Sequence, residues 1–251
     1  MRAYLSWLRR GLGLLVLLFT GPAVVAIAGI ADLRADWRTA NRDAVGIAPD
    51  PALVREPVLQ VYGARAFGWR GAFAVHTWIA AKRRDAADFT LYQVIGWNYW
   101  RGGTALSIRA GEPDRRWFGS EPKLYLDRRG DDVEALIDKL ETAVAGYPFK
   151  REYRTWPGPN SNTFTAWVAR QVPELRLELP PTAIGKDYLG TGLGSLFASA
   201  PSGTGYQVSL FGVAGLLVAA DEGLEVNLLG LSFGLDPLDL AVKLPGIGRL
   251  P

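Results

Sequence analysis

The chain has 251 residues, 49% of them hydrophobic, and a net charge of +3. This composition indicates a folded protein, and charges of both signs are interspersed along the chain, so we expect no nucleic-acid partner. Because cysteine is absent and His76 is the only histidine, the sequence excludes disulfides, thiolate nucleophiles, thiolate zinc sites and multi-histidine metal sites, and we expect no cofactor.

The chain begins with a basic N-terminus and a long apolar run. Residues 1–10, MRAYLSWLRR, carry arginines, and residues 11–30 contain no charge. Such a run spans roughly 30 Å as a helix, which is the thickness of a bilayer core. It is either a retained transmembrane anchor or a signal peptide cleaved after Ala26-Ile27-Ala28. We favour the anchor, because the apolar region of a signal peptide is typically about 7 to 15 residues long.

Basic residues on the two sides of this run do not fix its orientation. Three arginines, Arg34, Arg38 and Arg42, follow the run, and an equal number precede it. A short basic N-terminus before the first apolar segment nevertheless acts as a signal, so we expect most of the chain on the far side of the membrane. The polar, proline-containing residues 31–57 predict a short membrane-exit helix and then a linker.

The next part of the chain has the composition of β-strands. Residues 58–100 are rich in aromatic and β-branched residues and are divided by glycines. In residues 72–82, a period of two places His76 and Trp78 on one face of a strand and Thr77 on the other. The charged residues that follow predict a turn into a second strand over residues 89–100, and therefore a hairpin.

A third strand is predicted over residues 104–111, followed by a loop over residues 112–130 that carries Arg115, Arg116 and Trp117. Two helices come next. Residues 131–146 begin with two acidic residues and have apolar residues at three- and four-residue steps, and a second helix runs from about residue 162 to residue 171.

The character of the sequence changes near residue 188. Residues 188–220 contain no charge and many glycines, so they are long and apolar enough for a second membrane segment. Alternating apolar positions and the turn residues Asp221-Glu222-Gly223 favour antiparallel strands instead. We therefore predict an α+β domain over residues 58–190, with an antiparallel sheet packed on two helices, and a glycine-rich apolar β segment over residues 191–251.

The stretch RTWPGPNSNTFTAW, residues 154–167, places small polar residues at the start of the second helix. Ser161 is either a residue that simply begins and caps the helix, or a nucleophile beside free backbone amides that would form an oxyanion hole. A serine nucleophile needs a base, and His76 is the only imidazole in the chain. A histidine among apolar residues on a strand is also typical of a hydrogen-bonded core residue.

Four stretches carry a resemblance to a known family: GWRGAFAVHTWIA, PDRRWFG, WPGPNSNTFTAWVARQVPEL and LPPTAIGKDYLG. They resemble bacterial membrane-anchored proteins of the domain-of-unknown-function 3750 family, over residues 58–190. The resemblance names no activity. It implies a single-pass protein of the bacterial inner membrane, and with the orientation argued above we expect the bulk of the chain in the periplasm.

The order of a strand with a histidine, a second strand and an Asn-Ser pair opening a helix is similar, more distantly, to the circularly permuted papain-like superfamily. That superfamily includes lecithin retinol acyltransferase and cell-wall peptidases, and an Asn-Cys pair opens its helix. The resemblance implies Ser161 as nucleophile, Asn160 before it, His76 as base, and Gln93 or Tyr92 orienting the histidine. Serine departs from this pattern: a thiol ionises near a pH of about 8.5, whereas a hydroxyl needs a neighbouring base to become nucleophilic.

Two hypotheses follow. In the first, the chain is a serine-based hydrolase or acyltransferase acting on an amide or ester of the cell envelope. In the second, which we favour, it is a non-catalytic binding or scaffold module that uses a tryptophan-rich groove to hold an envelope glycan, lipid or peptide at the membrane. Candidate ligand-binding residues are Trp78, Trp156, Asn160, Asn162, and the pair Arg115 and Arg116, whose guanidinium groups would fit an anion.

Overall fold

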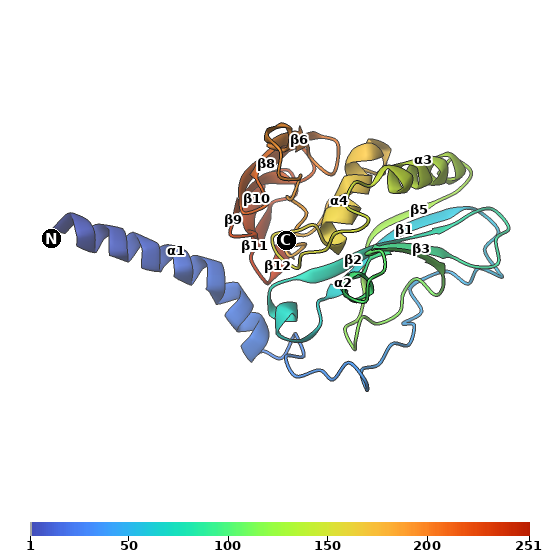
Figure 1. Cartoon of the computed structure of the whole chain (residues 1–251), viewed down its shortest axis with the longest axis horizontal. Helices are drawn as coiled ribbons and strands as arrows, with labels where there is room; N and C mark the ends of the chain where they lie inside the picture. The colour runs from blue at the N-terminus through green and yellow to red at the C-terminus, as the bar shows by residue number, and fades with distance from the viewer. Residues whose placement is uncertain (1) are drawn as a thin grey trace.

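The computed structural model describes residues 2–251, without the side chains of residues 2–5 and 8, so part of the predicted basic N-terminus lies outside the described residues. The described chain contains the helices α1 (Arg2–Ile27), α2 (Gly96–Trp100), α3 (Val133–Gly146) and α4 (Ser161–Gln171). Its strands form two antiparallel sheets (Figure 1). The predicted α+β class is confirmed.

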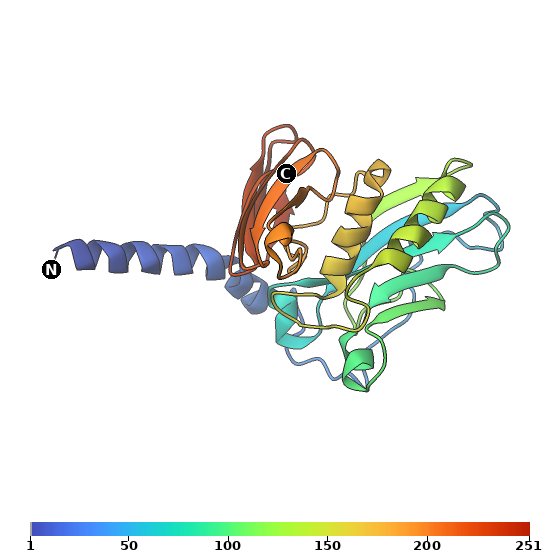
Figure 2. The same cartoon turned by 45° about the horizontal axis from the view of Figure 1, so that its top comes forward.

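The first sheet has five strands in the order β4-β3-β2-β1-β5. Helices α3 and α4 cover one face of it (Figure 2), and Leu140, Phe164 and Ile79 belong to the core between the helices and the sheet. The predicted hairpin is formed by β2 and β3, with Ile79 opposite Tyr92. The strands are β1 (Val58–Arg65), β2 (Val75–Lys82), β3 (Thr90–Val94), β4 (Leu106–Ala110) and β5 (Lys123–Arg129).

The other face of this sheet is covered by the linker and by the loop that follows β4. Trp78 and Tyr62 lie in a second core there, against which Val54 of the linker packs. The exit helix predicted within residues 31–57 was wrong, since this segment contains turns and no helix. Aspartate side chains accept hydrogen bonds from backbone amides two residues ahead, as Asp36 does from Arg38, and this pattern competes with a helix.

Two strand predictions also need correction. Residues 96–100, expected at the end of the second strand, form the short helix α2 that leads the chain back toward β4. Residues 123–129, expected in a loop, form β5 at the edge of the sheet, where Asp127 lies opposite Gln60. Charged residues at an exposed edge hide the apolar alternation by which a strand is recognised.

The C-terminal residues form a seven-stranded sheet in which every strand pairs with the next one along the chain. The strands predicted here are confirmed, including the hairpin turn at residues 221–223. The sheet is made of β6 (Phe197–Ser199), β7 (Gly205–Leu210), β8 (Ala214–Ala219), β9 (Gly223–Leu228), β10 (Leu231–Asp236), β11 (Ala241–Leu244) and β12 (Gly248–Leu250).

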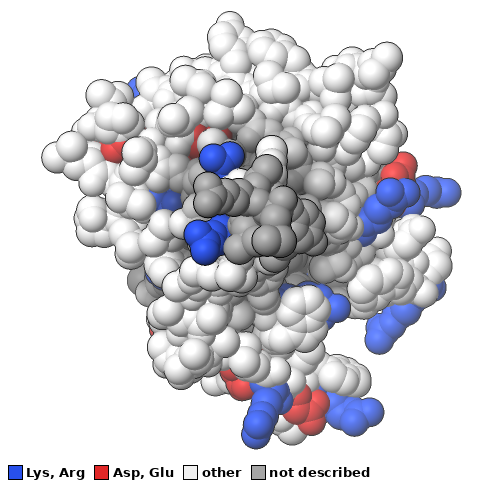
Figure 3. Space-filling view, turned by 90° about the vertical axis from the view of Figure 1, so that its left-hand side faces the viewer, with Lys and Arg blue, Asp and Glu red and all other residues white. Residues whose placement is uncertain are grey.

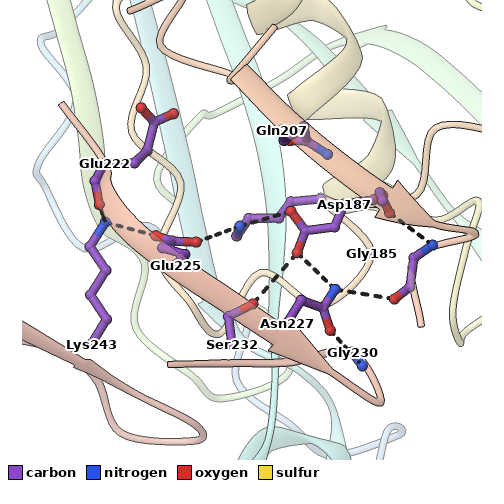
Figure 4. Close-up of polar contacts among 12 residues, drawn as sticks. Gly185, Asp187, Gln207, Glu222, Glu225, Asn227, Gly230, Ser232 and Lys243 are labelled. Atoms are coloured by element: carbon purple, nitrogen blue, oxygen red, sulfur yellow. Dashed lines mark hydrogen bonds and ion pairs between the residues drawn. The ribbon is translucent and has the colours of Figure 1, made fainter. Parts of the chain in front are cut away.

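The inner face of this C-terminal sheet, which packs on the α+β domain, is polar. Glu225 lies between two lysines, 2.7 Å from Lys186 and 2.7 Å from Lys243, and all three side chains are buried (Figure 4). Lys186 also contacts Asp187 at 3.0 Å, and Asp187 accepts a hydrogen bond from Asn227. Charged and amide groups therefore line the inner face of this sheet and join it to the segment that precedes it, where a globular protein usually has an apolar core.

Helix α1 is long and apolar enough to cross a bilayer over Arg9–Ile27, and no other helix within residues 2–251 is. Both a retained anchor and a signal sequence have these properties. The C-terminal half of α1 packs against the rest of the chain. Val25 is buried with Ala72, and a Cβ atom at Gly21 would lie 2.0 Å from the carbonyl oxygen of Pro245.

Candidate functional site

A cleft of about 410 Å³ opens where β2 and β3 diverge at one end of the five-stranded sheet. Its walls come from α1, the β1–β2 connection, the start of β2, the end of β3 with α2, the loop before β5, the segment before α4 with the start of that helix, the 182–186 turn and the β9–β10 turn. The size is that of a typical small-molecule site. The lining includes nine aromatic side chains, Phe19, Phe67, Trp69, Phe73, Trp97, Trp100, Trp117, Tyr153 and Trp156.

His76 lines this cleft from β2. Its ring stacks on Trp117 with 3.7 Å between the ring centroids, and Trp117 stacks in turn on Trp97. Burial disfavours the imidazolium form and lowers the pKa of His76 to about 4, although a hydrogen bond with Gln93 acts in the opposite direction. His76 is therefore a neutral aromatic member of the cleft wall at physiological pH.

Gln93 and Tyr92, the two residues expected to orient the histidine, point to opposite faces of β3. The oxygen Oε1 of Gln93 lies 3.2 Å from Nε2 of His76, within hydrogen-bonding distance. The Tyr92 hydroxyl instead donates to Glu141 of α3. The pair that the structure brings together is therefore His76 and Gln93.

Ser161 begins α4 but does not cap it. The N-cap residue is Asn160, whose side chain accepts hydrogen bonds from the amides of Asn162 and Thr163. The interpretation of Ser161 as the cap was wrong, because the cap lies one residue earlier. The oxyanion hole expected at residues 161–163 would use these same amides, and two of them are already occupied.

Ser161 and His76 both line the cleft, yet no hydrogen bond joins them or any other described group to the Ser161 hydroxyl. The reason lies in the period of β2. Thr77 points toward α4, where its hydroxyl bonds to Asn162, and the neighbouring His76 consequently points to the other face. The two candidate catalytic residues therefore share only the cleft at the end of the sheet, and no hydrogen bond joins them.

The two asparagines beside Ser161 are structural in this arrangement. Asn160 donates to the carbonyl oxygens of Thr155 and Ile184, and Asn162 donates to those of Val75 and Ile184. Both line the cleft with amide groups that are already bonded. They fix the helix start against β2 and the 182–186 turn.

The other predicted ligand-binding residues are placed differently. Trp156 lines the cleft and is half exposed, and its indole donates to the carbonyl of Leu229. Trp78 is buried beneath the cleft, where it stacks with Tyr62. Arg115 and Arg116 lie outside the cleft, and Arg116 pairs with Glu121 at 2.6 Å.

Several lining residues were missed by the sequence analysis. Phe19 belongs to the apolar run, and Leu229 and Leu231 belong to the C-terminal sheet, which pattern alone does not bring to the cleft. Among the described residues of the lining, Arg70 is the only charged one, and its guanidinium lies 5.0 Å from the Trp69 ring centre. Among the described residues, no group of three or more carboxylate or histidine side chains is placed to hold a metal ion.

Comparison with known proteins gives a single finding. A family model described as a protein of unknown function (DUF3750) matches residues 56–188, more than half of the chain. Neither a curated protein nor a solved structure matches the chain significantly. The matched range includes His76, Gln93 and Ser161, and it ends before the C-terminal sheet.

Proposed function

The chain belongs to the DUF3750 family of proteins of unknown function, and we propose that it is a membrane-anchored binding protein that holds an acyl chain in the aromatic cleft. The observation that supports this most directly is Phe19. This residue lies within the membrane-length apolar span of α1 and also in the cleft wall. A ligand in the cleft would therefore contact the anchor helix itself, beside the bilayer that the helix crosses.

The chemistry of the lining favours a lipid over a glycan or peptide. Most of its side chains are aromatic or aliphatic, and the amide groups of Asn160 and Asn162 are already hydrogen-bonded within the protein. A glycan would need free donors and acceptors. Arg70, which is exposed and forms no ion pair within the described residues, would meet an anionic head group at the cleft mouth.

Photo-crosslinking in nanodiscs tests this proposal. The full chain is reconstituted with phosphatidylglycerol that carries a diazirine on its acyl chain, and the crosslinked peptides are mapped. We expect adducts on the peptides that contain Trp100 and Trp156. Adducts confined to α1, with none in the cleft, would reject acyl-chain binding there.

A pair of tryptophan variants provides the control. Trp100 is exposed and lines the cleft, whereas Trp37 is similarly exposed and lies outside it. Trp100→Ala should lower cleft crosslinking by roughly fivefold, because loss of one aromatic contact costs on the order of 1 kcal/mol. Trp37→Ala should leave crosslinking unchanged. Arg70→Gln should reduce the preference for phosphatidylglycerol over phosphatidylethanolamine.

A second candidate function is acyl transfer or hydrolysis by Ser161. It is favoured by one feature, the Ser161 hydroxyl, which has no hydrogen-bond partner in the described residues and faces the same cleft as His76. A serine-directed fluorophosphonate probe discriminates the two functions. Labelling of the native chain that is lost in both Ser161→Ala and His76→Phe would support the enzyme, whereas an unlabelled chain that still binds lipid would leave only the binding function.

A further inference from the structure

The C-terminal sheet has its polar and apolar faces reversed relative to a sheet that packs in a water-soluble protein. Two alternate residues of β7, Gln207 and Ser209, point inward and are polar and buried. The residues between them, Tyr206, Val208 and Leu210, are apolar and more than half exposed. An antiparallel sheet with one face in water normally shows the opposite pattern.

The apolar residues form continuous rows across the outer face of the sheet. Cross-strand pairing connects six exposed residues from β7 to β12, in the order Tyr206, Val218, Leu224, Leu235, Val242 and Leu250. A neighbouring row connects Phe197, Val208, Leu216, Val226 and Phe233. Neither row contains a charged residue, so this outer face is a contiguous apolar surface of the kind that marks an interaction site.

The C-terminal sheet contacts α1 within the part of that helix that is long and apolar enough to cross a bilayer. The β11–β12 turn packs on the helix at Gly21 and Pro22, and a Cβ atom at Gly246 would lie 2.6 Å from the Pro22 nitrogen. These positions fall inside the membrane-length span, Arg9–Ile27, rather than beyond its end. If α1 crosses a bilayer, the edge of the sheet therefore reaches the bilayer as well.

The figures show that the outer face and the anchor share one side of the molecule. Helix α1 leaves the molecule on the side of the C-terminal sheet (Figures 1 and 2). Seen from that side, much of the upper surface is uncharged, a few charged groups lie near the centre and at the upper left, and the larger clusters of Lys, Arg, Asp and Glu lie toward the right and lower margins (Figure 3).

We propose that the outer face of the C-terminal sheet is seated in the adjacent leaflet of the bilayer that α1 crosses. The sheet then acts as a second, monotopic membrane attachment, with its apolar rows among acyl chains and its charged inner face bound to the α+β domain. This accounts for the reversed faces, because lipid is the solvent in which exposed leucine and valine rows are favourable. The proposal needs α1 to remain part of the chain, and it does not depend on what the cleft binds.

The absence of cysteine makes single-cysteine labelling a direct test. Val208→Cys and Val218→Cys place an environment-sensitive fluorophore on the outer face, and Thr142→Cys places one on the exposed side of α3 as the control. The full-length variants are reconstituted in vesicles of phosphatidylethanolamine and phosphatidylglycerol. Nitroxide-labelled lipids should quench the two outer-face labels several-fold more than the Thr142 label, and iodide in the aqueous phase should quench only the latter.

Two results would overturn the proposal. Outer-face labels that stay accessible to iodide in vesicles would show that this face is in water. Labels that are shielded from iodide and not quenched by lipid nitroxides, with crosslinking between copies, would show that a second copy of the chain covers the face. A failure of acyl-chain binding in the cleft would change neither readout, so the two proposals can fail separately.

Discussion

At the scale of single residues, His76 is the most informative side chain. It is buried, it stacks between Trp117 and Trp78, and its one hydrogen bond goes to Gln93, which carries no charge. No carboxylate stabilises the imidazolium form, so desolvation lowers its pKa. A general base works best with a pKa near the working pH, which makes His76 better suited to the wall of a cleft than to proton transfer.

The pKa of His76 predicts a pH dependence of stability. His76 binds a proton near pH 6.5 in the unfolded chain and only near pH 4 in the folded chain. The contribution of His76 to the free energy of unfolding is therefore greatest above about pH 6.5 and falls as the pH drops toward 4. This pKa difference between the folded and the unfolded chain corresponds to a change in unfolding free energy on the order of 3 kcal/mol. Because His76 is the only histidine, its imidazole signals in an NMR titration are unambiguous. A midpoint near 6.5, or an equally steep pH dependence of stability in His76→Phe, would contradict this.

The choice between Gln93 and Tyr92 shows what the sequence leaves open at this scale. The two-residue period of a strand predicts that these two side chains point to opposite faces of the sheet, but it does not predict which of them lies on the same face as the histidine. The answer depends on α3, whose Glu141 binds the Tyr92 hydroxyl from a distant part of the chain. Such a contact follows from tertiary packing and not from local pattern.

At the scale of elements, the start of α4 depends on Asn160. Its oxygen satisfies two amides of the first helical turn, and its amide nitrogen bonds to the carbonyls of Thr155 and Ile184. Gly185 is required opposite it, since a Cβ atom there would lie 2.3 Å from the Asn160 side chain and its φ is +101°. The sequence predicted the helix and the polar residues that begin it. It did not predict the cap, because three successive residues, 160–162, all have side chains that can cap a helix.

This arrangement predicts that substitutions at Asn160 and at the neighbouring Ser161 have very different effects on the free energy of unfolding. Asn160→Ala should lower the free energy of unfolding by about 2 to 3 kcal/mol, because it removes a helix cap and leaves buried carbonyl groups unpaired. Ser161→Ala should change it by less than about 0.5 kcal/mol, because the Ser161 hydroxyl has no bond to lose. Urea denaturation of the detergent-solubilised chain measures both. Equal losses in the two variants would mean that Ser161 contributes to the helix start.

Asn160→Asp separates the two roles of the Asn160 side chain. A carboxylate keeps the cap and loses the donors to Thr155 and Ile184, so its stability should fall between those of the native chain and Asn160→Ala.

At the scale of the whole molecule, alternation predicted the C-terminal strands without indicating which face is buried. The usual rule would turn Val208 and Leu216 inward and expose Gln207 and Glu225, and the structure does the reverse. The reason is long-range, since Lys186 and Asp187 in the segment before the sheet supply the partners that Glu225 and Asn227 need. The sequence therefore predicted the strands of this sheet, but not its orientation or its contribution to the cleft.

The charged junction between the C-terminal sheet and the segment that precedes it predicts that stability depends strongly on Glu225. Burial alone would raise the pKa of Glu225, and Lys186 and Lys243 lower it overall, so the group is ionised and paired. Glu225→Gln removes the buried carboxylate that Lys186 and Lys243 share and leaves each lysine with one other carboxylate, Asp187 and Glu178 respectively, so it should cost about 3 to 5 kcal/mol of unfolding free energy. The matched control is Glu134→Gln, because Glu134 pairs with Arg83 in a partly exposed network and should cost less than about 1 kcal/mol. Chemical denaturation measures the unfolding free energy of both variants. If the two variants lose similar amounts, the junction is hydrated and other contacts hold the C-terminal sheet. A large loss confined to Glu225→Gln means that paired buried charges hold this sheet on the α+β domain.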